Sequence, residues 1–269
     1  MDTQSVIVYC LCGDLLKGLF HKGDKQSKMC DAEVITNPIV AMLSFKGNFR
    51  MACQFMYENG YVPGKVSKSL FNRRLHRIAD LFLSRIFQIG EHWKNINERF
   101  TYVLDSYPIE VCDNYHIPRC KIYSGEEWRG YIASKKRYFY GVHIQIMITE
   151  TGEPVDFFLA PGAFSDTSAL LLYSFDISEG SWITDDKTYN DYTMEDDLHE
   201  AGLELIPIRK KNSLRSVPPF IFYLQSSVGK IVETTIHLIE RLLPKSIHAV
   251  SAKEFKLIVA LFGLACSIY

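Results

Sequence analysis

The sequence predicts a mixed α/β protein that begins with a wholly helical segment. The first hundred residues carry apolar side chains at helical spacing, interrupted by Gly- and Asn-containing breaks. Residues 137–150 then alternate between apolar and polar side chains, as a strand does, and strand and helix patterns alternate from there onward. We therefore expect a helical domain over 1–98 and an α/β domain with a sheet of mixed pairing over 99–269.

Three helices are expected within the first domain. The first lies in "MCDAEVITNPIVAMLSFKG", with Asp31 as its N-cap, although Pro38 could delay its true start, and Gly47-Asn48 breaks its pattern. The second lies in "FRMACQFMYENGYVPG" and is ended by Asn59-Gly60. The third is "LFNRRLHRIADLFLSRIFQIG", which Ser67 or Ser69 can cap. Short helices joined by glycine-containing turns resemble a helix-turn-helix arrangement.

The third helix is basic at its start. Residues 65–77 (KVSKSLFNRRLHR) hold five Lys or Arg and no acid, whereas the whole chain has a net charge of −1. Bulk charge therefore gives no support to nucleic-acid binding, but this local excess does. Arg73, Arg74 and Arg77 could contact DNA phosphates or base edges. The alternative interpretation is an exposed helix with an ordinary charged face.

The second domain begins with a short expected strand, Tyr102-Val103-Leu104, that Ser106-Tyr107-Pro108 would end. Residues 137–150 and "VDFFLAPG" read as a hairpin turned by "TGEP". Asp166 would cap the next helix. The remaining pattern predicts, in order, the strand "GSWITDD", the helix "DYTMEDDLHEAG", the strand "LELIPIRKK", a helix over 228–243 and an apolar helix over 251–269.

Carboxylates stand at the predicted ends of two strands. Asp105 follows the first strand, and Asp185-Asp186 follow the fourth. On the helix over 228–243, Glu233 borders an apolar stripe at helical spacing and could reach the sheet edge. A lone Asp at a strand end can simply be solvated, but three converging carboxylates would need neutralisation. Oxygen-rich sites of this kind favour Mg²⁺ or Mn²⁺.

Several segments together resemble a known family. They are "FKGNFRMACQFMYENGYVPGKVSKSLFNRRLHRI", "VLDSYPIEVCD", "KKRYFYGVHIQIMITETGEPVDFFLAPGAFSDTSAL", "WITDDKTYNDY" and "VETTIHLIERLLPKSIHAVSAKEF". Over nearly its whole length the chain is similar to bacterial insertion-sequence transposases of the DDE class, nearest to insertion-sequence group nine-eighty-two. The resemblance implies an RNase H-like catalytic domain whose mixed sheet is flanked by helices.

The same resemblance implies the chemistry and the site. Its acids fall on Asp105, Asp186 and Glu233, which would be both catalytic residues and ligands of two Mg²⁺ or Mn²⁺ ions. The expected partners are the terminal inverted repeats of the element and target DNA, with a homodimer in the DNA complex. Ends would be cleaved and the 3′-hydroxyl joined to target DNA. Lys187, His143 and Lys230 are candidate DNA-phosphate contacts.

The chain departs from the family pattern at two places. His143 and Gln145 stand where a basic residue and then His are usual, and Gly229, with Lys230 beside it, stands where Arg is usual. Both departures leave the three acids in place but remove groups that would hold DNA phosphate. They favour an alternative function, a catalytically impaired transposase that only binds DNA.

Cysteine usage and hydropathy predict a cytoplasmic location. The seven cysteines contain no CxxC pair, which is typical of a reducing compartment. The first eighteen residues lack a basic start, and the longest apolar run, residues 257–269, is too short to span a bilayer. We therefore expect no membrane role.

Overall fold

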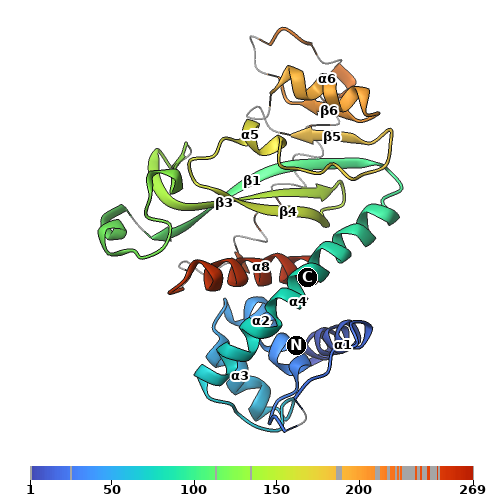
Figure 1. Ribbon diagram of the computed structural model, residues 1–269. Helices are drawn as coiled ribbons and strands as arrows, with labels where there is room; N and C mark the ends of the chain where they lie inside the picture. The colour runs from blue at the N-terminus through green and yellow to red at the C-terminus, as the bar shows by residue number, and fades with distance from the viewer. Residues whose placement is uncertain are drawn as a thin grey trace. The chain divides into compact units, whose positions relative to one another are not determined.

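Figure 1 shows the computed structural model of the chain. It describes residues 2–268 except 25, 113, 134, 186–189, 210–212 and 217–218, and between 222 and 248 it describes only 223, 225, 234, 237, 241, 242 and 247. The chain forms two compact units. We call residues 1–86, 238–249 and 253–269 the helical unit, and residues 87–237 and 250–252 the sheet unit.

The helical unit is built around one almost fully buried helix, α2. Every residue of α2 from Asp31 to Met42 is buried, and the helix packs against both α1 and α3. The helices that belong wholly or partly to this unit are α1 (Asp2–Gly18), α2 (Asp31–Phe45), α3 (Phe49–Glu58), α4 (Lys68–Ile96) and α8 (Ala252–Ile268). The three predicted helices and the final apolar helix are therefore present.

The start of α2 differs from the prediction. Its N-cap is Cys30, whose sulfur accepts from the Glu33 N–H while the Glu33 carboxylate accepts from the Cys30 N–H, a reciprocal capping box. Pro38 lies inside the helix and does not delay it. Because neighbouring helices surround this segment, tertiary packing offsets the backbone hydrogen bond that proline removes.

A buried ion pair joins α4 to the first turn of α2. Arg74 Nη2 donates to Asp31 Oδ1 at 2.5 Å, Arg74 Nη1 donates to the Met29 carbonyl at 2.6 Å, and His21 Nε2 lies 2.8 Å from Asp31 Oδ2. Burial by itself raises the pKa of the Asp31 carboxyl, but hydrogen bonds from His21 and Arg74 outweigh burial and lower it. The carboxylate also lies at a helix N-terminus, where the helix dipole favours negative charge.

The sheet unit holds a six-stranded mixed sheet. Its strands are β1 (Thr101–Cys112), β2 (Arg129–Ile132), β3 (Arg137–Thr149), β4 (Pro154–Pro161), β5 (Trp182–Asp185) and β6 (Glu204–Pro207). The order is β2-β3-β1-β5-β6, and β4 also pairs with β3. Pairing is antiparallel among β1 to β4 and parallel from β1 through β5 to β6, as Figure 1 lets the reader follow. The predicted mixed sheet, flanked by helices and preceded by N-terminal helices, is confirmed.

Two short helices accompany this sheet. In Figure 1, α5 (Asp166–Leu170) and α6 (Tyr192–Glu200) lie beside the β5 and β6 end of the sheet. The apolar core of the unit joins Tyr102 and Leu104 of β1 to Ile183 of β5, Leu205 of β6 and Leu170 of α5. One face of the sheet is therefore filled by side chains of both connecting helices.

Strand β1 is longer than the sequence pattern predicted. It continues through Ser106, Tyr107 and Pro108, and Pro108 lies opposite His143 of β3. On its other side β1 pairs with β5 only over Thr101–Val103. Beyond Val103, no described strand pairs with this side of β1. Pro108 has no backbone N–H, and such a residue is tolerated where one side of the strand is unpaired. Asp105 consequently lies within the strand and not at its exit.

Smaller differences concern other elements. The sequence pattern missed β2, which pairs with the first four residues of β3, and α5 is a single short helix that Ser165 caps. The two compact units separate within α4, between Ile86 and Phe87, and α8 groups with the N-terminal helices. The domain boundary at residues 98 and 99 remains a prediction. No helix in the described part of the chain is long and apolar enough to cross a membrane.

The buried ion pair predicts a selective loss of stability. Arg74→Ala leaves the Asp31 carboxylate buried without its arginine partner, so the free energy of unfolding should fall by about 3–5 kcal/mol. The matched control is Arg73→Ala, an exposed neighbour in the same helix turn, which should change it by less than about 0.5 kcal/mol. Urea unfolding followed by circular dichroism measures both.

A pH series completes this test. Because the folded-state pKa of Asp31 is lowered, its contribution to stability is full above the unfolded value of about 4 and is lost as pH falls through the folded value. The Arg74→Ala protein should lose less stability on acidification than the parent protein. Equal losses for Arg73→Ala and Arg74→Ala would contradict this account of α4.

Candidate functional site

Asp105 lies in the middle of β1, where the antiparallel partner β3 supports it. Its direct neighbour across the ladder is Ile146, and its side chain is partly exposed. The Ser106 N–H donates to Asp105 Oδ1 at 2.7 Å. Such a backbone hydrogen bond favours the charged form of a carboxylate. Asp105 is thus an ionisable oxygen donor held on a rigid strand.

The parallel strand β5 runs beside β1 and leads towards the same region. The paired residues are Thr101 with Trp182, Tyr102 with Ile183, and Val103 with Thr184. Asp185 is the last described residue of β5 and is only 3% exposed. Since alternate residues of a strand share a face, Asp185 lies on the same face as Ile183, which belongs to the apolar core.

By the same alternation, Asp105 lies on the face of the sheet opposite to Leu104, Ile183 and Asp185. The predicted residues Asp186, Lys187, Gly229, Lys230 and Glu233 lie outside the described residues. In the part of the chain that the structure describes, no group of three Asp, Glu, His or Cys side chains is arranged to hold a metal ion.

His143 and Gln145 lie on the face of β3 opposite to Asp105. The register pairs Asp105 with Ile146, so these two side chains share one face of the sheet. The residues next to Ile146 in the strand, among them Gln145, and likewise His143, point to the other face. Gln145 is fully buried and its Nε2 donates to Asp166 Oδ1 at 3.2 Å. Burial lowers the pKa of His143, against the opposing effect of the Asp166 charge, which favours a neutral ring. The geometry therefore does not bring His143 to Asp105.

The three predicted arginines of α4 divide into two kinds. Arg73 and Arg77 are exposed and lie one helix turn apart on the same side of α4. Arg74 is 5% exposed, and its guanidinium is held by the Asp31 ion pair and the Met29 carbonyl. Only Arg73 and Arg77 present a charge that a ligand could reach.

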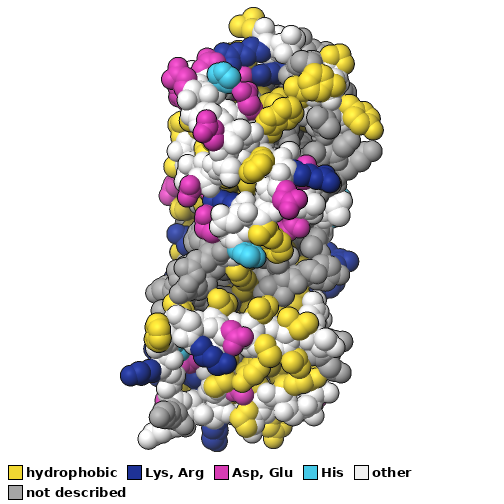
Figure 2. Space-filling view, turned by 90° about the vertical axis from the view of Figure 1, so that its right-hand side faces the viewer, with side chains coloured by type: hydrophobic (Ala, Val, Ile, Leu, Met, Phe, Trp, Pro, Cys, Tyr) yellow, Lys and Arg dark blue, Asp and Glu magenta, His cyan; other side chains and the backbone are white. Residues whose placement is uncertain are grey.

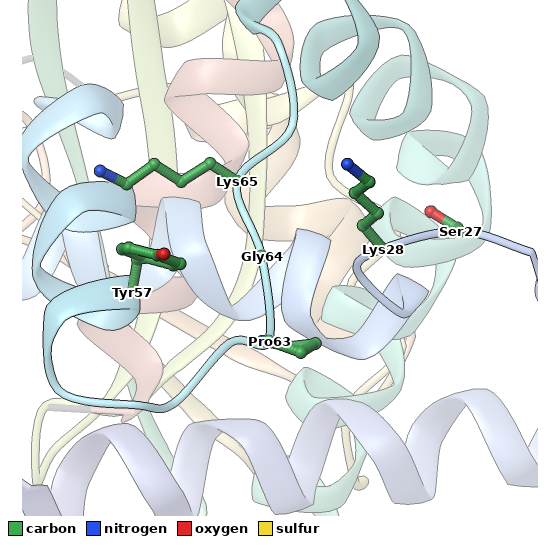
Figure 3. A pocket seen from close by; sticks show the side chains of 6 residues that line it. All are labelled: Ser27, Lys28, Tyr57, Pro63, Gly64 and Lys65. Atoms are coloured by element: carbon green, nitrogen blue, oxygen red, sulfur yellow. The ribbon is translucent and has the colours of Figure 1, made fainter.

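Sequence analysis missed Lys28, a basic residue from another segment that lines the same hollow as Lys65 of the basic segment. Lys28 precedes α2, and Lys65 precedes α4; both line a hollow of about 630 Å³ together with Tyr57. Figure 3 shows Lys65 stretched over the Tyr57 ring, with Lys28 on the other side of the segment that carries Gly64. The Lys65 Nζ is 4.5 Å from the ring centroid, a cation–π contact that extends the side chain. No single stretch of sequence carries this arrangement, so local charge counting could not find it.

The face shown in Figure 2 carries acidic and basic side chains in mixture over the sheet unit, and no continuous basic patch is seen there. On the helical unit the same view shows hydrophobic side chains gathered, and Val6, Ile7 and Leu11 of α1 are about half exposed. The basic segment from Lys65 to Arg77, in which Lys65, Lys68, Arg73 and Arg77 are exposed, is a surface suited to a polyanion.

A second feature that the sequence pattern did not reveal lies just past β5 and β6. The Ile208 N–H donates to the Asp185 carbonyl at 3.1 Å, and Asn190 Nδ2 donates to the Ile208 carbonyl at 3.1 Å. Arg209 then makes a two-pronged ion pair with Glu195, at 2.5 and 2.8 Å. The residues on both sides of segment 186–189 are thus fixed to Ile208.

Comparison with known proteins gives one family. A family model described as "Transposase DDE domain" matches residues 97–242, more than half of the chain. Among curated proteins no match is found. Among solved structures, the chain is similar to one from the cryo-EM structure of the piggyBac transposase synaptic complex with hairpin DNA, with 11% identity and a TM-score of 0.46. The match covers 98% of this chain and 64% of that chain, so this chain spans less than two thirds of its length.

Proposed function

The chain belongs to the transposase DDE domain family, and from this premise we propose that it cleaves the ends of an insertion element and joins them to target DNA. Its closest family group is proposed to be insertion-sequence group nine-eighty-two, on the sequence segments described above. The proposed substrates are the terminal inverted repeats of the element and a target duplex.

The parallel pairing of β1 with β5 is the observation that carries this proposal. The last registered pair is Val103 with Thr184, and two residues further along each sequence stand Asp105 and Asp186. If the strands keep their register, these two acids are neighbours. Alternation then gives them the same face of the sheet, while Asp185 points into the core on the other face. The register therefore supports Asp186, and not Asp185, as the second acid.

The third acid is proposed to be Glu233. Oxygen donors on three carboxylates suit Mg²⁺ or Mn²⁺, and the partly exposed Asp105 on its rigid strand fits that role. Asp105, Asp186 and Glu233 would hold two such ions, which when bound lower the pKa of a water and stabilise charge on the attacking and leaving oxygens.

The reaction itself is two in-line displacements at phosphorus. In the first, a water oxygen bonds to the phosphorus at the element end as the bond to the 3′-oxygen breaks, which leaves a 3′-hydroxyl. In the second, that 3′-oxygen bonds to a target phosphorus and displaces another 3′-oxygen. Both steps need the DNA phosphate to be positioned, and Lys187 and Lys230 are the proposed positioning cations. We leave His143 out of this set, because it lies on the other face of the sheet.

The helical unit is proposed to bind the element end. Arg73 and Arg77 are exposed on one side of α4, and Lys65 and Lys68 precede them on the same basic segment. A homodimer in the DNA complex would bring two element ends together. We leave Arg74 out of the DNA contacts, since its guanidinium is engaged within the unit.

One of the two grounds for an impaired protein is weakened. Because His143 and Gln145 lie away from the Asp105 face, their departure from the family pattern removes no phosphate contact from that face. The departure at Gly229 lies outside the described residues. A protein that only binds DNA remains the alternative outcome of the nicking assay below.

The main test is nicking of a labelled terminal-repeat duplex in the presence of Mg²⁺. Asp105→Asn removes a ligand charge without changing size, so nicking should fall by at least ~100-fold, as expected for a direct ligand, while duplex binding is kept. The control is Asp156→Asn on β4, a carboxylate whose ladder partner Met147 lies on the face of the sheet opposite to Asp105, so this change should not reduce nicking. Unreduced nicking by Asp105→Asn would refute the site. If the parent protein binds the duplex without nicking it, the DNA-binding alternative holds.

A second test separates the two adjacent acids after β5. Asp186→Asn should abolish nicking with little change in melting temperature, because it removes a ligand. Asp185→Asn should retain nicking and change chiefly the melting temperature, because Asp185 is buried on the core face. Inactive Asp185→Asn alongside active Asp186→Asn would show that the register is displaced by one residue.

A third test concerns the basic face of α4. Replacing Arg73 and Arg77 together with Ala should weaken duplex binding and reduce the slope of log K against log salt by about two, one for each lost phosphate contact. The control replaces Lys17 and Lys22, two exposed lysines outside the basic segment. If the slope is unchanged in the double arginine variant, Arg73 and Arg77 do not contact DNA and form an ordinary solvated face of the helix.

A further inference from the structure

A cavity of about 940 Å³ lies within the helical unit, between α2, α3, the start of α4 and α8. Its volume is near the upper end of the ~300–1,000 Å³ typical of small-molecule sites. Every lining residue belongs to the helical unit, so the cavity is separate from Asp105 and the sheet.

The cavity has a basic rim. Lys46, Arg50, Lys65 and Lys68 line it and are all exposed, whereas Glu254 is the one carboxylate among the lining residues. These cations come from the α2–α3 turn, from α3 and from the segment that begins α4. The net charge around the opening favours an anionic group.

The interior of the cavity is aromatic and aliphatic. Phe49 and Phe71 line it with ring centroids 6.4 Å apart and planes at 61°, and Phe262 and Ile258 of α8 also contribute. Phe71 and Phe262 are buried, while Phe49 is only half-buried. A planar ring that enters the cavity therefore meets a partly open aromatic side chain on which it can stack.

One polar side chain in this apolar interior has an unused hydrogen-bond acceptor, which a ligand could fill. Asn37 of α2 lines the cavity and is 0% exposed, and its Oδ1 accepts no hydrogen bond from the described residues. Its Nδ2 has only a weak contact with Met56 Sδ, at 3.7 Å. A buried amide oxygen without a donor is costly, so an N–H group of a ligand at this position would be stabilising.

We infer that this cavity binds one unpaired nucleotide, with its phosphate at the basic rim and its base inside against Phe49 and Asn37. An exocyclic amino group would donate to Asn37 Oδ1, and adenine would also accept from Nδ2 through N7. A fatty acid would satisfy the rim and the apolar interior but has no donor for Asn37. The nucleotide could come from a DNA strand, which rests on the proposed function, or from a free nucleotide, which does not.

The test uses the full chain and fluorescence anisotropy with labelled pentanucleotides. A dA5 probe should bind roughly tenfold more tightly than a pentamer of unsubstituted deoxypurine nucleotides, which keep the ring and N7 but lack the exocyclic amino donor. Asn37→Leu should erase that preference while the melting temperature stays equal or rises, because an unsatisfied buried amide is replaced by an apolar group. Phe49→Ala should weaken the binding of both probes by a similar factor, because the base loses the ring on which it stacks.

Lys68→Gln should weaken the binding of both probes by the same factor and reduce the salt dependence of that binding. Lys22 lies outside the cavity, so Lys22→Gln should change neither the affinity nor its salt dependence. Displacement of dA5 by AMP would assign the cavity to free nucleotides as well; no displacement with the dA5 preference intact would assign it to a strand. Equal binding of dA5 and the unsubstituted-purine pentamer, or a preference that survives Asn37→Leu, would overturn the inference. Element-end nicking by Asp105 is measured separately, so either proposal can fail without the other.

Discussion

The buried pairing of Asp31 with Arg74 is the constraint on which the geometry of the helical unit depends. It joins the first turn of the central helix α2 to α4, and His21 and the Met29 carbonyl complete the hydrogen bonds of the pair. A buried ion pair constrains the rotation of a helix, because a rotation that separates the partners leaves an uncompensated buried charge. With Arg74 directed inward, Arg73 and Arg77 are directed outward.

The same rotation shapes the cavity that holds Asn37. Phe71 lies one turn before Arg74 on the buried side of α4, and Lys68 lies one further turn back at the cavity rim. The ion pair therefore determines the position of two basic surfaces. One is the exposed side of α4, and the other is the rim of the cavity at the start of α4.

Much of this fold could be predicted from the sequence because its signals are local. The helices around residues 31–45 and 49–58 are bounded by glycine, asparagine and capping residues, and the β3–β4 hairpin alternates clearly across a short turn. The identity of Asp105 as a candidate acid came from its position next to an apolar run. These features depend on neighbours in sequence, which a reader of sequence can see.

The rest depends on contacts between distant segments. The pattern Ser106-Tyr107-Pro108 predicts a strand end, and only the loss of the β5 partner beyond Val103 explains why the strand continues. In the sequence, Arg74 cannot be distinguished from an exposed arginine, because its partner Asp31 lies 43 residues earlier in the chain. Likewise His143 seems close to Asp105 in the family pattern, yet the ladder register puts the two on opposite faces.

The hydrogen bonds that hold Asp185 and Asn190 to Ile208 have a consequence for how ionic strength acts on this protein. The ion pair between Glu195 and Arg209, the residue after Ile208, is largely buried, with side chains 5% and 15% exposed, so dissolved salt screens it little. Arg73 and Arg77 are exposed and their attraction to a polyanion is screened strongly. Concentrated salt would therefore weaken the attraction of Arg73 and Arg77 for a polyanion while the framework around β5 stays in place, and lowering the salt again would restore that attraction without any refolding step.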